Sequence, residues 1–277
     1  MASRIGGSIK NTIHPVAQDF LRHMDLVVAA STDAEGRVWA SAISGPRGFI
    51  EVPDEQHVRI RSDAADAQLL SNIAANGMIG LLALELETRL RIRLNGRAAL
   101  TDGSIEINAE EVFSNCQKYI QARERDGVEW AHLPASIAKG ESLSPSQTRL
   151  IENADTLFIA SYHPDRGADA SHRGGNPGFV TVEDERTLLL PDYSGNNMFQ
   201  TLGNIEDNGK AGLLFVDFET GSSLQLTGTA GILWDPAEFG DLPGAQRAVR
   251  FWVEKSVETE GAFPAGWRFI DYSPSNP

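Results

Sequence analysis

The sequence of 277 residues contains a single cysteine, Cys116. One cysteine excludes a disulfide within the chain, and it excludes zinc or iron–sulfur sites that are built on several cysteines. The six histidines do not follow the spacing of a metal-binding motif, so we expect no bound metal.

Long hydrophobic runs are also missing. No stretch approaches the roughly 20 apolar residues that a membrane-spanning helix needs. Residues 1–11 are polar and contain glycine, without the apolar core of a signal peptide. We therefore expect a cytoplasmic protein with no membrane partner.

Positive charge is scarce as well. The 24 Lys and Arg residues stand against 38 Asp and Glu residues, which gives a formal net charge of −14. Such a chain repels a polyanion at long range, so we expect no nucleic-acid partner, although a local cationic pocket for a small anion stays compatible with this charge. The length suits one large domain or two modest ones.

The most informative feature is an internal repeat, because residues 27–100 resemble residues 158–232. Identities recur in the same order at offsets of 130 to 132 residues, as when Asn76-Gly77 corresponds to Asn208-Gly209. The copies are too long and too far apart for a solenoid. The repeat therefore indicates the duplication of a small domain.

Each copy has the pattern of a small closed sheet. Short apolar runs between turns, such as residues 26–30 and 79–84, predict strands. Residues 67–75 and 199–206 predict one short helix per copy, each ended by an Asn-Gly pair. We therefore predict a mainly β protein with few helices, made of two tandem β-barrels related by internal duplication.

The chain is expected to divide into five parts. These are an N-terminal extension (1–25), the first copy (26–103), a helix and linker (104–150), the second copy (151–235), and a C-terminal helix and tail (236–277). The connecting helix is predicted at 108–125, where Asn108 suits an N-cap, and the C-terminal helix at 243–258. Residues 133–146 are predicted to be a linker and residues 261–277 an irregular tail.

The two copies differ at two places. Ala42 and Ile43 of the first copy correspond to His172 and Arg173 of the second. The segment 191–197 also carries two extra residues and is rich in hydroxyl and amide groups. A glycine-containing turn before a helix can donate hydrogen bonds to a phosphate, and Arg173 can supply the charge. The alternative is an ordinary polar loop with Arg173 on a solvated face.

Four stretches carry a resemblance to a known family: residues 169–180, 190–197, 211–215 and 115–121. They resemble the pyridoxamine 5′-phosphate oxidase-like family of FMN-binding split β-barrel proteins, in its tandem double-barrel branch. The resemblance implies that FMN is the cofactor and lies between two split barrels. It places the phosphate on the strand-to-helix loop and the ring near the His-Arg-Gly-Gly run.

Carried over residue by residue, the resemblance implies a set of FMN contacts in the second copy. These are Ser171, His172, Arg173, Tyr193, Gly195, Asn196 and Asn197. Relatives usually place an arginine after the Gly-Asn-Asn run, where this chain has Met198. A cation for the phosphate is therefore expected from elsewhere.

The first copy offers candidates for that cation. Arg89, Arg91 and Arg93 alternate with apolar residues along a predicted strand, and we expect Arg91 to be the functional one. The alternative is the charged, solvated face of an edge strand. Lys118 and Tyr119 are also expected at the ligand, because the resembled oxidases use a tyrosine and an arginine after the first barrel's last strand to hold the substrate.

The expected function is an FMN-binding oxidoreductase, an oxidase or a reductase, that acts on a small organic molecule by hydride transfer. His172 is the catalytic candidate, because an imidazole can donate or accept a proton near neutral pH; its alternative role is to fix the cofactor.

Two other functions stay open, namely a flavin-binding, redox-sensing module without a substrate and a binder of a deazaflavin or haem. We expect one flavin site per chain. A monomer and a homodimer are both compatible with the duplication.

Overall fold

The structure is a computed structural model that describes residues 9–125, 136–195 and 198–277. The first copy contains α2 (Pro15–Arg22), β1 (Leu26–Thr32), β2 (Val38–Ser44), β3 (Ile50–Glu51), β4 (His57–Arg61), the 3-10 helix η1 (Ser62–Ala64), α3 (Ala67–Asn76), β5 (Met78–Glu85), β6 (Leu90–Thr101), β7 (Ser104–Ser114) and β8 (Ala122–Arg125).

The second copy follows β9 (Ile137–Gly140). It contains α4 (Pro145–Asn153), β10 (Thr156–His163), β11 (Gly167–Gly174), β12 (Thr181–Val182), β13 (Thr187–Tyr193), α5 (Gln200–Asn208), β14 (Lys210–Asp217), β15 (Ser222–Leu233), the 3-10 helix η2 (Pro236–Glu238), β16 (Ala245–Thr259) and β17 (Trp267–Asp271).

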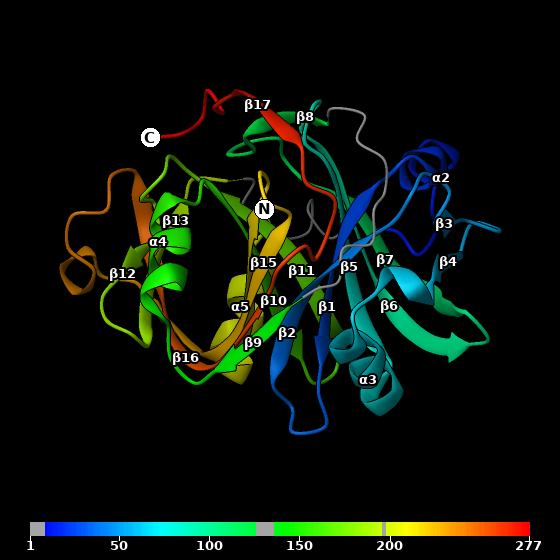
Figure 1. Ribbon diagram of the computed structural model, residues 1–277, viewed down its shortest axis with the longest axis horizontal. Helices are drawn as coiled ribbons and strands as arrows, with labels where there is room; N and C mark the ends of the chain where they lie inside the picture. The colour runs from blue at the N-terminus through cyan, green and yellow to red at the C-terminus, as the bar shows by residue number, and fades with distance from the viewer. Residues whose placement is uncertain (1–8, 126–135, 196–197) are drawn as a thin grey trace.

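The two copies have the same strand order. The first sheet runs β2-β1-β5-β6-β7-β4-β3, and the second runs β11-β10-β14-β15-β16-β13-β12, with β9 paired to β16. Replacing each strand by its repeat partner converts one order into the other, and α3 and α5 occupy equivalent places. In Figure 1 the first copy, in blue to cyan, lies to the right of the second copy, in green to orange. The predicted mainly β, duplicated two-barrel class is confirmed.

Each copy has its own apolar core, and a third core joins the copies. The third cluster takes Val28 and Leu82 from the first copy and the equivalent Phe158 and Leu214 from the second, all at most 2% exposed. Burying each such large side chain contributes about 1.5–3 kcal/mol. The chain therefore forms within itself an extensive apolar interface between the two copies.

Glycines allow the two sheets to approach closely at equivalent places. A Cβ on Gly80 of β5 would lie 2.6 Å from the Ala168 carbonyl oxygen of β11. A Cβ on Gly212 of β14 would likewise lie 2.6 Å from the Val38 carbonyl oxygen of β2. The paired contacts show that the copies are related by an approximate twofold symmetry, and the pairing of β8 with β17 follows it.

Two predicted helices are wrong. The range 108–125, predicted as the connecting helix, contains most of β7 and the short strand β8, and the range 243–258 is almost entirely β16. The burial in β7 alternates, with Ile105, Ile107 and Ala109 inside, and Val249, Phe251 and Val253 alternate in the same way in β16. This period of two, with an apolar face on the core, outweighed the capping residue that favoured a helix.

The linker and tail predictions also need correction. Residues 133–135 of the predicted linker lie outside the described residues, but 137–140 form β9, and α4 begins at Pro145. Ser144 and Gln147 form a capping box there, a sequence signal that the two prolines obscured. The predicted irregular tail contains β17. Within the described part of the chain, no helix is long and apolar enough to cross a membrane.

Candidate functional site

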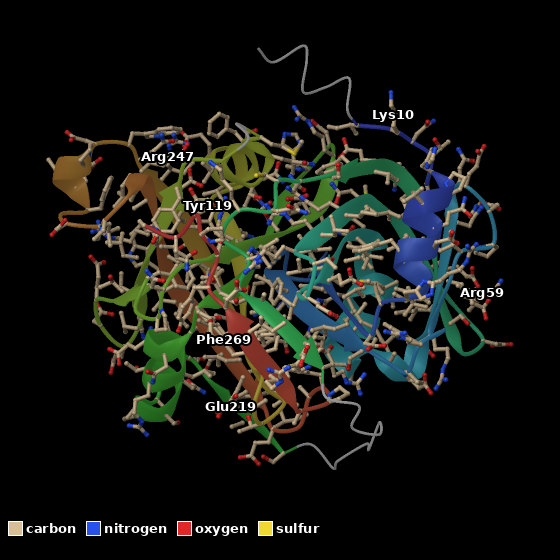
Figure 2. The ribbon with its side chains drawn as sticks, turned by 90° about the horizontal axis from the view of Figure 1, so that it is seen from above. Lys10, Arg59, Tyr119, Glu219, Arg247 and Phe269 are labelled. Atoms are coloured by element: carbon tan, nitrogen blue, oxygen red, sulfur yellow. The ribbon has the colours of Figure 1, made fainter. Side chains whose placement is uncertain are left out.

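A pocket of about 70 Å³ lies where the two copies meet. The first copy contributes residues from β6 and from the segment after β7, and the second contributes the ends of β11 and β13 and the start of α5. Figure 2 shows Tyr119 and Arg247, one from each copy, on the same side of the molecule, and both line this pocket. The site is therefore a shared product of the duplication.

Most of the sequence-predicted site residues come together in this pocket. Its lining includes Arg91, Lys118, Tyr119, Ser171, His172, Arg173, Tyr193 and Gly195. Asn196 and Asn197 lie outside the described residues. Arg89 is placed elsewhere, because it precedes β6 and pairs with Asp271.

The pocket is cationic although the chain is acidic. Five cationic side chains line it, and Asp192 is the single carboxylate among its lining residues. Asp192 forms an ion pair with Arg173, with 3.3 Å between N and O, and another with Arg247 at 3.1 Å. Arg93, fully buried, pairs with Asp169. These pairings leave positive charge in excess at the pocket wall.

Arg91 contributes to that excess. Its Nε is buried and has no hydrogen-bond partner among the described residues. Burial, together with repulsion from Arg93 and Arg173, lowers the pKa of Arg91 to about 9. A guanidinium held beside like charges is stabilised by an anion, so this wall of the pocket suits a negatively charged ligand.

His172 is neutral in this environment. Its ring is 3% exposed and packs edge-on against Phe158 at 5.9 Å between centroids. Burial, with the nearby charges of Arg91 and Arg173, holds the pKa of His172 well below its ordinary value of 6.5. Arg91 Nη1 lies 3.5 Å from His172 Nδ1, and because a guanidinium only donates, this contact favours Nδ1 as the acceptor and the proton on Nε2, which has no partner among the described residues.

The N-terminus of α5 opens onto the same pocket. Thr201 and Leu202 of its first turn line the pocket, and the N-cap residue Phe199 makes no side-chain cap hydrogen bond. The first N–H groups of a helix need acceptors, and the helix dipole favours an anion there. This helix start can therefore receive a phosphate.

The equivalent helix in the first copy is already capped. Asp66 accepts a hydrogen bond from Leu69 N at 2.6 Å at the start of α3, and Gln225 Nε2 approaches its other oxygen at 3.4 Å. Burial raises the pKa of the Asp66 carboxyl against these hydrogen bonds. An internal carboxyl group thus occupies the helix start that α5 leaves open.

Gln225 occupies the place in the first copy that corresponds to the pocket. It stands at the repeat position of Arg93, and its Nε2 donates to the Ala40 carbonyl at 3.0 Å and to Ser41 Oγ at 2.8 Å. Ser41 is the counterpart of the pocket residue Ser171. Internal hydrogen bonds of Gln225 therefore satisfy the first copy's side, whereas the other side joins the sheets through the Arg93–Asp169 pair and keeps an excess of cations.

Two pocket residues that sequence reasoning missed are Asp192 and Arg247. They are direct cross-strand partners in the pairing of β13 with β16. Arg247 also lies over the Phe199 ring at 5.0 Å. Arg247 fell within a predicted helix, and the alternation of Val249, Phe251 and Val253 farther along was the signal that would have placed it on a strand.

Met198 stands where the resemblance implies an arginine, and cationic side chains from other elements line the same pocket. Met198 lines the pocket, and Asn115 Nδ2 donates to its sulfur at 3.3 Å. Lys118, Arg173 and Arg247 bring cations to this end of the pocket from three separate segments.

Comparison with known families gives the class of the chain. The sequence model of the family described as pyridoxamine 5′-phosphate oxidase matches the chain twice, over residues 13–131 and 143–264. The two matches cover both copies and most of the chain. The chain belongs to the pyridoxamine 5′-phosphate oxidase family.

Solved structures resemble parts of the chain. HupZ of Group A Streptococcus is 18% identical over 40% of this chain and 90% of its own, with a TM-score of 0.32. An FMN-binding protein of Syntrophomonas wolfei is 8% identical over 41% and 84%, and a FAD-binding protein of Mesorhizobium loti is 12% identical over 46% and 99%, each with a TM-score of 0.32. No curated protein sequence matches the chain.

Proposed function

We propose that this pocket binds a flavin, specifically FMN, and that the protein is an oxidoreductase that acts on a small organic molecule. The observation that carries the proposal is the Arg91 guanidinium, which lies in a shared cationic pocket and whose buried Nε has no hydrogen-bond partner among the described residues. Membership of the pyridoxamine 5′-phosphate oxidase family supports a flavin as the anion.

The residues present suit a flavin phosphate. The uncapped start of α5 supplies backbone donors, and Thr201 supplies a hydroxyl group. Arg91, Lys118 and Arg173 would balance the charge of the phosphate. A phosphate there would relieve the repulsion that lowers the pKa of Arg91.

FMN, when bound, supplies the hydride-transfer chemistry. The protein's part is to orient its ligands and to hold protons at defined atoms. His172, neutral with its proton on Nε2, would serve as a hydrogen-bond donor toward the cofactor or the substrate rather than as a group that ionises near pH 7. Both copies of one chain line the pocket, which supports a site that forms within a single chain.

The test begins with the purified full-length protein. We expect visible flavin absorbance, or its appearance after incubation with FMN, and chromatography of the released cofactor should yield FMN rather than FAD. Absence of flavin uptake, with uptake of a deazaflavin or haem instead, would overturn the flavin assignment. Retained flavin without turnover across electron acceptors and a substrate panel would overturn the oxidoreductase part.

A further inference from the structure

The segment 115–121, which we call the strap, leaves the first copy and reaches the loop of the second. Tyr119 Oη donates to the Ser194 carbonyl at 2.8 Å, and Lys118 Nζ donates to the same oxygen at 3.4 Å. The Tyr119 ring also packs against Tyr193, with 5.1 Å between centroids. Ser194 directly precedes Gly195 at the pocket, so the strap helps to set where this loop lies.

Tyr119 has a backbone conformation that needs external support. Its φ of 65° lies in the left-handed region, which non-glycine residues rarely adopt. Its N–H donates to Ser273 Oγ at 3.0 Å, and its carbonyl accepts from Gln121 Nε2 at 3.0 Å. A Cβ on Gly174 would overlap that carbonyl, so glycine is what lets the strap lie against β11.

Gln121 connects the strap to three other parts of the chain. It is 0% exposed, and its Oε1 accepts from Ser273 N at 2.8 Å and from Asn276 Nδ2 at 3.1 Å. Its Nε2 lies within 3.3 Å of four acceptors: the carbonyls of Tyr119, Asp155 and Gly175, and Asn276 Oδ1. A buried amide with this set of partners fixes the relative position of all of them.

We propose that Gln121 is a positioning residue for the flavin pocket. Through Tyr119 it ties the tail after β17 to the loop at Ser194, so that Tyr119 and Lys118 hold the phosphate side of the pocket in its binding geometry. Gln121 lies outside the pocket lining and acts through Tyr119. The ligand in this inference rests on the proposed function, whereas the link from Gln121 to Tyr119 is a property of the chain itself.

The test compares two buried glutamines. Gln121→Met removes the proposed link, and Gln225→Met is the matched control, because Gln225 is also buried and also donates from Nε2 to a backbone carbonyl between the sheets. Ser273→Ala removes the hydroxyl that accepts from the Tyr119 N–H and from Ser275 N but leaves Gln121 in place, and it keeps the test available if Gln121→Met does not fold.

Two readouts are measured for each variant. The first is ¹⁹F NMR of fluorotyrosine-labelled, flavin-free protein, which has four tyrosines, with Tyr119→Phe to assign the Tyr119 signal. We expect Gln121→Met and Ser273→Ala to shift or broaden the Tyr119 signal and Gln225→Met to leave it in place. The second is the FMN dissociation constant, which should rise about tenfold in Gln121→Met and stay within about twofold in Gln225→Met.

The outcomes separate this inference from the proposed function. An unchanged Tyr119 signal and unchanged FMN affinity in Gln121→Met and Ser273→Ala would overturn the positioning role and leave flavin binding intact. Equal changes in the Gln225→Met control would also overturn it, because they would reflect general loss of packing. A wild-type protein that takes up no flavin would refute the proposed function. A Tyr119 signal that changes in Gln121→Met and Ser273→Ala but not in Gln225→Met would still support the link.

Discussion

The two copies share a fold but treat the same place in it differently. At the start of α3 in the first copy, Asp66 caps the helix and Gln225 of the second copy donates to Ala40 and Ser41, so the chain's own hydrogen bonds fill this place. At the start of α5 in the second copy, the N-cap residue Phe199 makes no side-chain cap hydrogen bond, and Arg91 of the first copy lies beside other cations. The comparison leads us to expect the ligand at the second place, where the described residues leave groups of both copies unsatisfied.

The largest expected effect comes from Arg91→Met. Loss of the guanidinium should weaken FMN binding about a hundredfold, which corresponds to about 2.7 kcal/mol. Because Arg91 lies beside Arg93 and Arg173, the flavin-free variant should unfold at the same or a higher temperature than the wild type. Titration with FMN and thermal unfolding measure the two quantities.

Arg97→Met on the same strand is the control, since Arg97 is exposed and pairs with Glu110. Weak binding in both variants, or a marked loss of stability in flavin-free Arg91→Met, would contradict the account of a ligand-compensated charge.

The next largest effect is expected from Gly174→Ala. The added Cβ would overlap the Tyr119 carbonyl, so the free energy of unfolding should fall by about 1–3 kcal/mol. Ser44 stands at the repeat position of Gly174, and Ser44→Ala should change it by less than about 0.5 kcal/mol. Urea unfolding of both variants gives the comparison, and equal values would mean that the strap is not seated as described.

A pH series sharpens the contrast between His172 and its counterpart Ala42. The folded pKa of His172 lies below 6.5, so the unfolded chain binds more protons than the folded chain between these two pKa values. Stability is therefore lost as the pH falls below about 6.5, by at most about 1.4 kcal/mol per pH unit from this group.

His172→Gln should make the dependence on pH less steep over that window, as measured by denaturant unfolding from pH 7 to pH 5. The same slope in the variant and the wild type would show that His172 is not held neutral.

Lys118→Met should have the smallest effect. Lys118 is partly exposed and reaches Ser194 at 3.4 Å, so its loss should weaken FMN binding only about threefold, and less at high salt. Titrations at two ionic strengths measure this. A loss as large as that of Arg91→Met would place the main phosphate cation on the strap instead of on β6.

The repeat made the two-barrel class predictable, because Asn76-Gly77 and its counterpart mark equivalent helix ends in both copies. The divergent His172 and Arg173 led to one wall of the pocket, and the alternation of Arg91 and Arg93 led to another. These features are local in sequence, or are related by the repeat, so a pattern can reveal them.

The rest depended on contacts that no pattern contains. Arg247 meets Asp192 only through the register of β13 and β16, and the capping residue at Asn108 favoured a helix where tertiary packing selected the strand β7. The closure of the first copy's site by Gln225 depends on how the sheets cross. Sequence spacing does not determine which residues of two distant segments meet in this way.

The central claim is that the second copy's side of the chain binds one flavin and the first copy's side binds none. Native mass spectrometry of the FMN-saturated protein, with the bound flavin counted per chain, tests it most directly. The account predicts one FMN per wild-type chain and a much smaller fraction of FMN-bound Arg91→Met chains at the lowest FMN concentration that saturates the wild type. Two FMN molecules per chain, or one that persists on Arg91→Met with undiminished affinity, would contradict it.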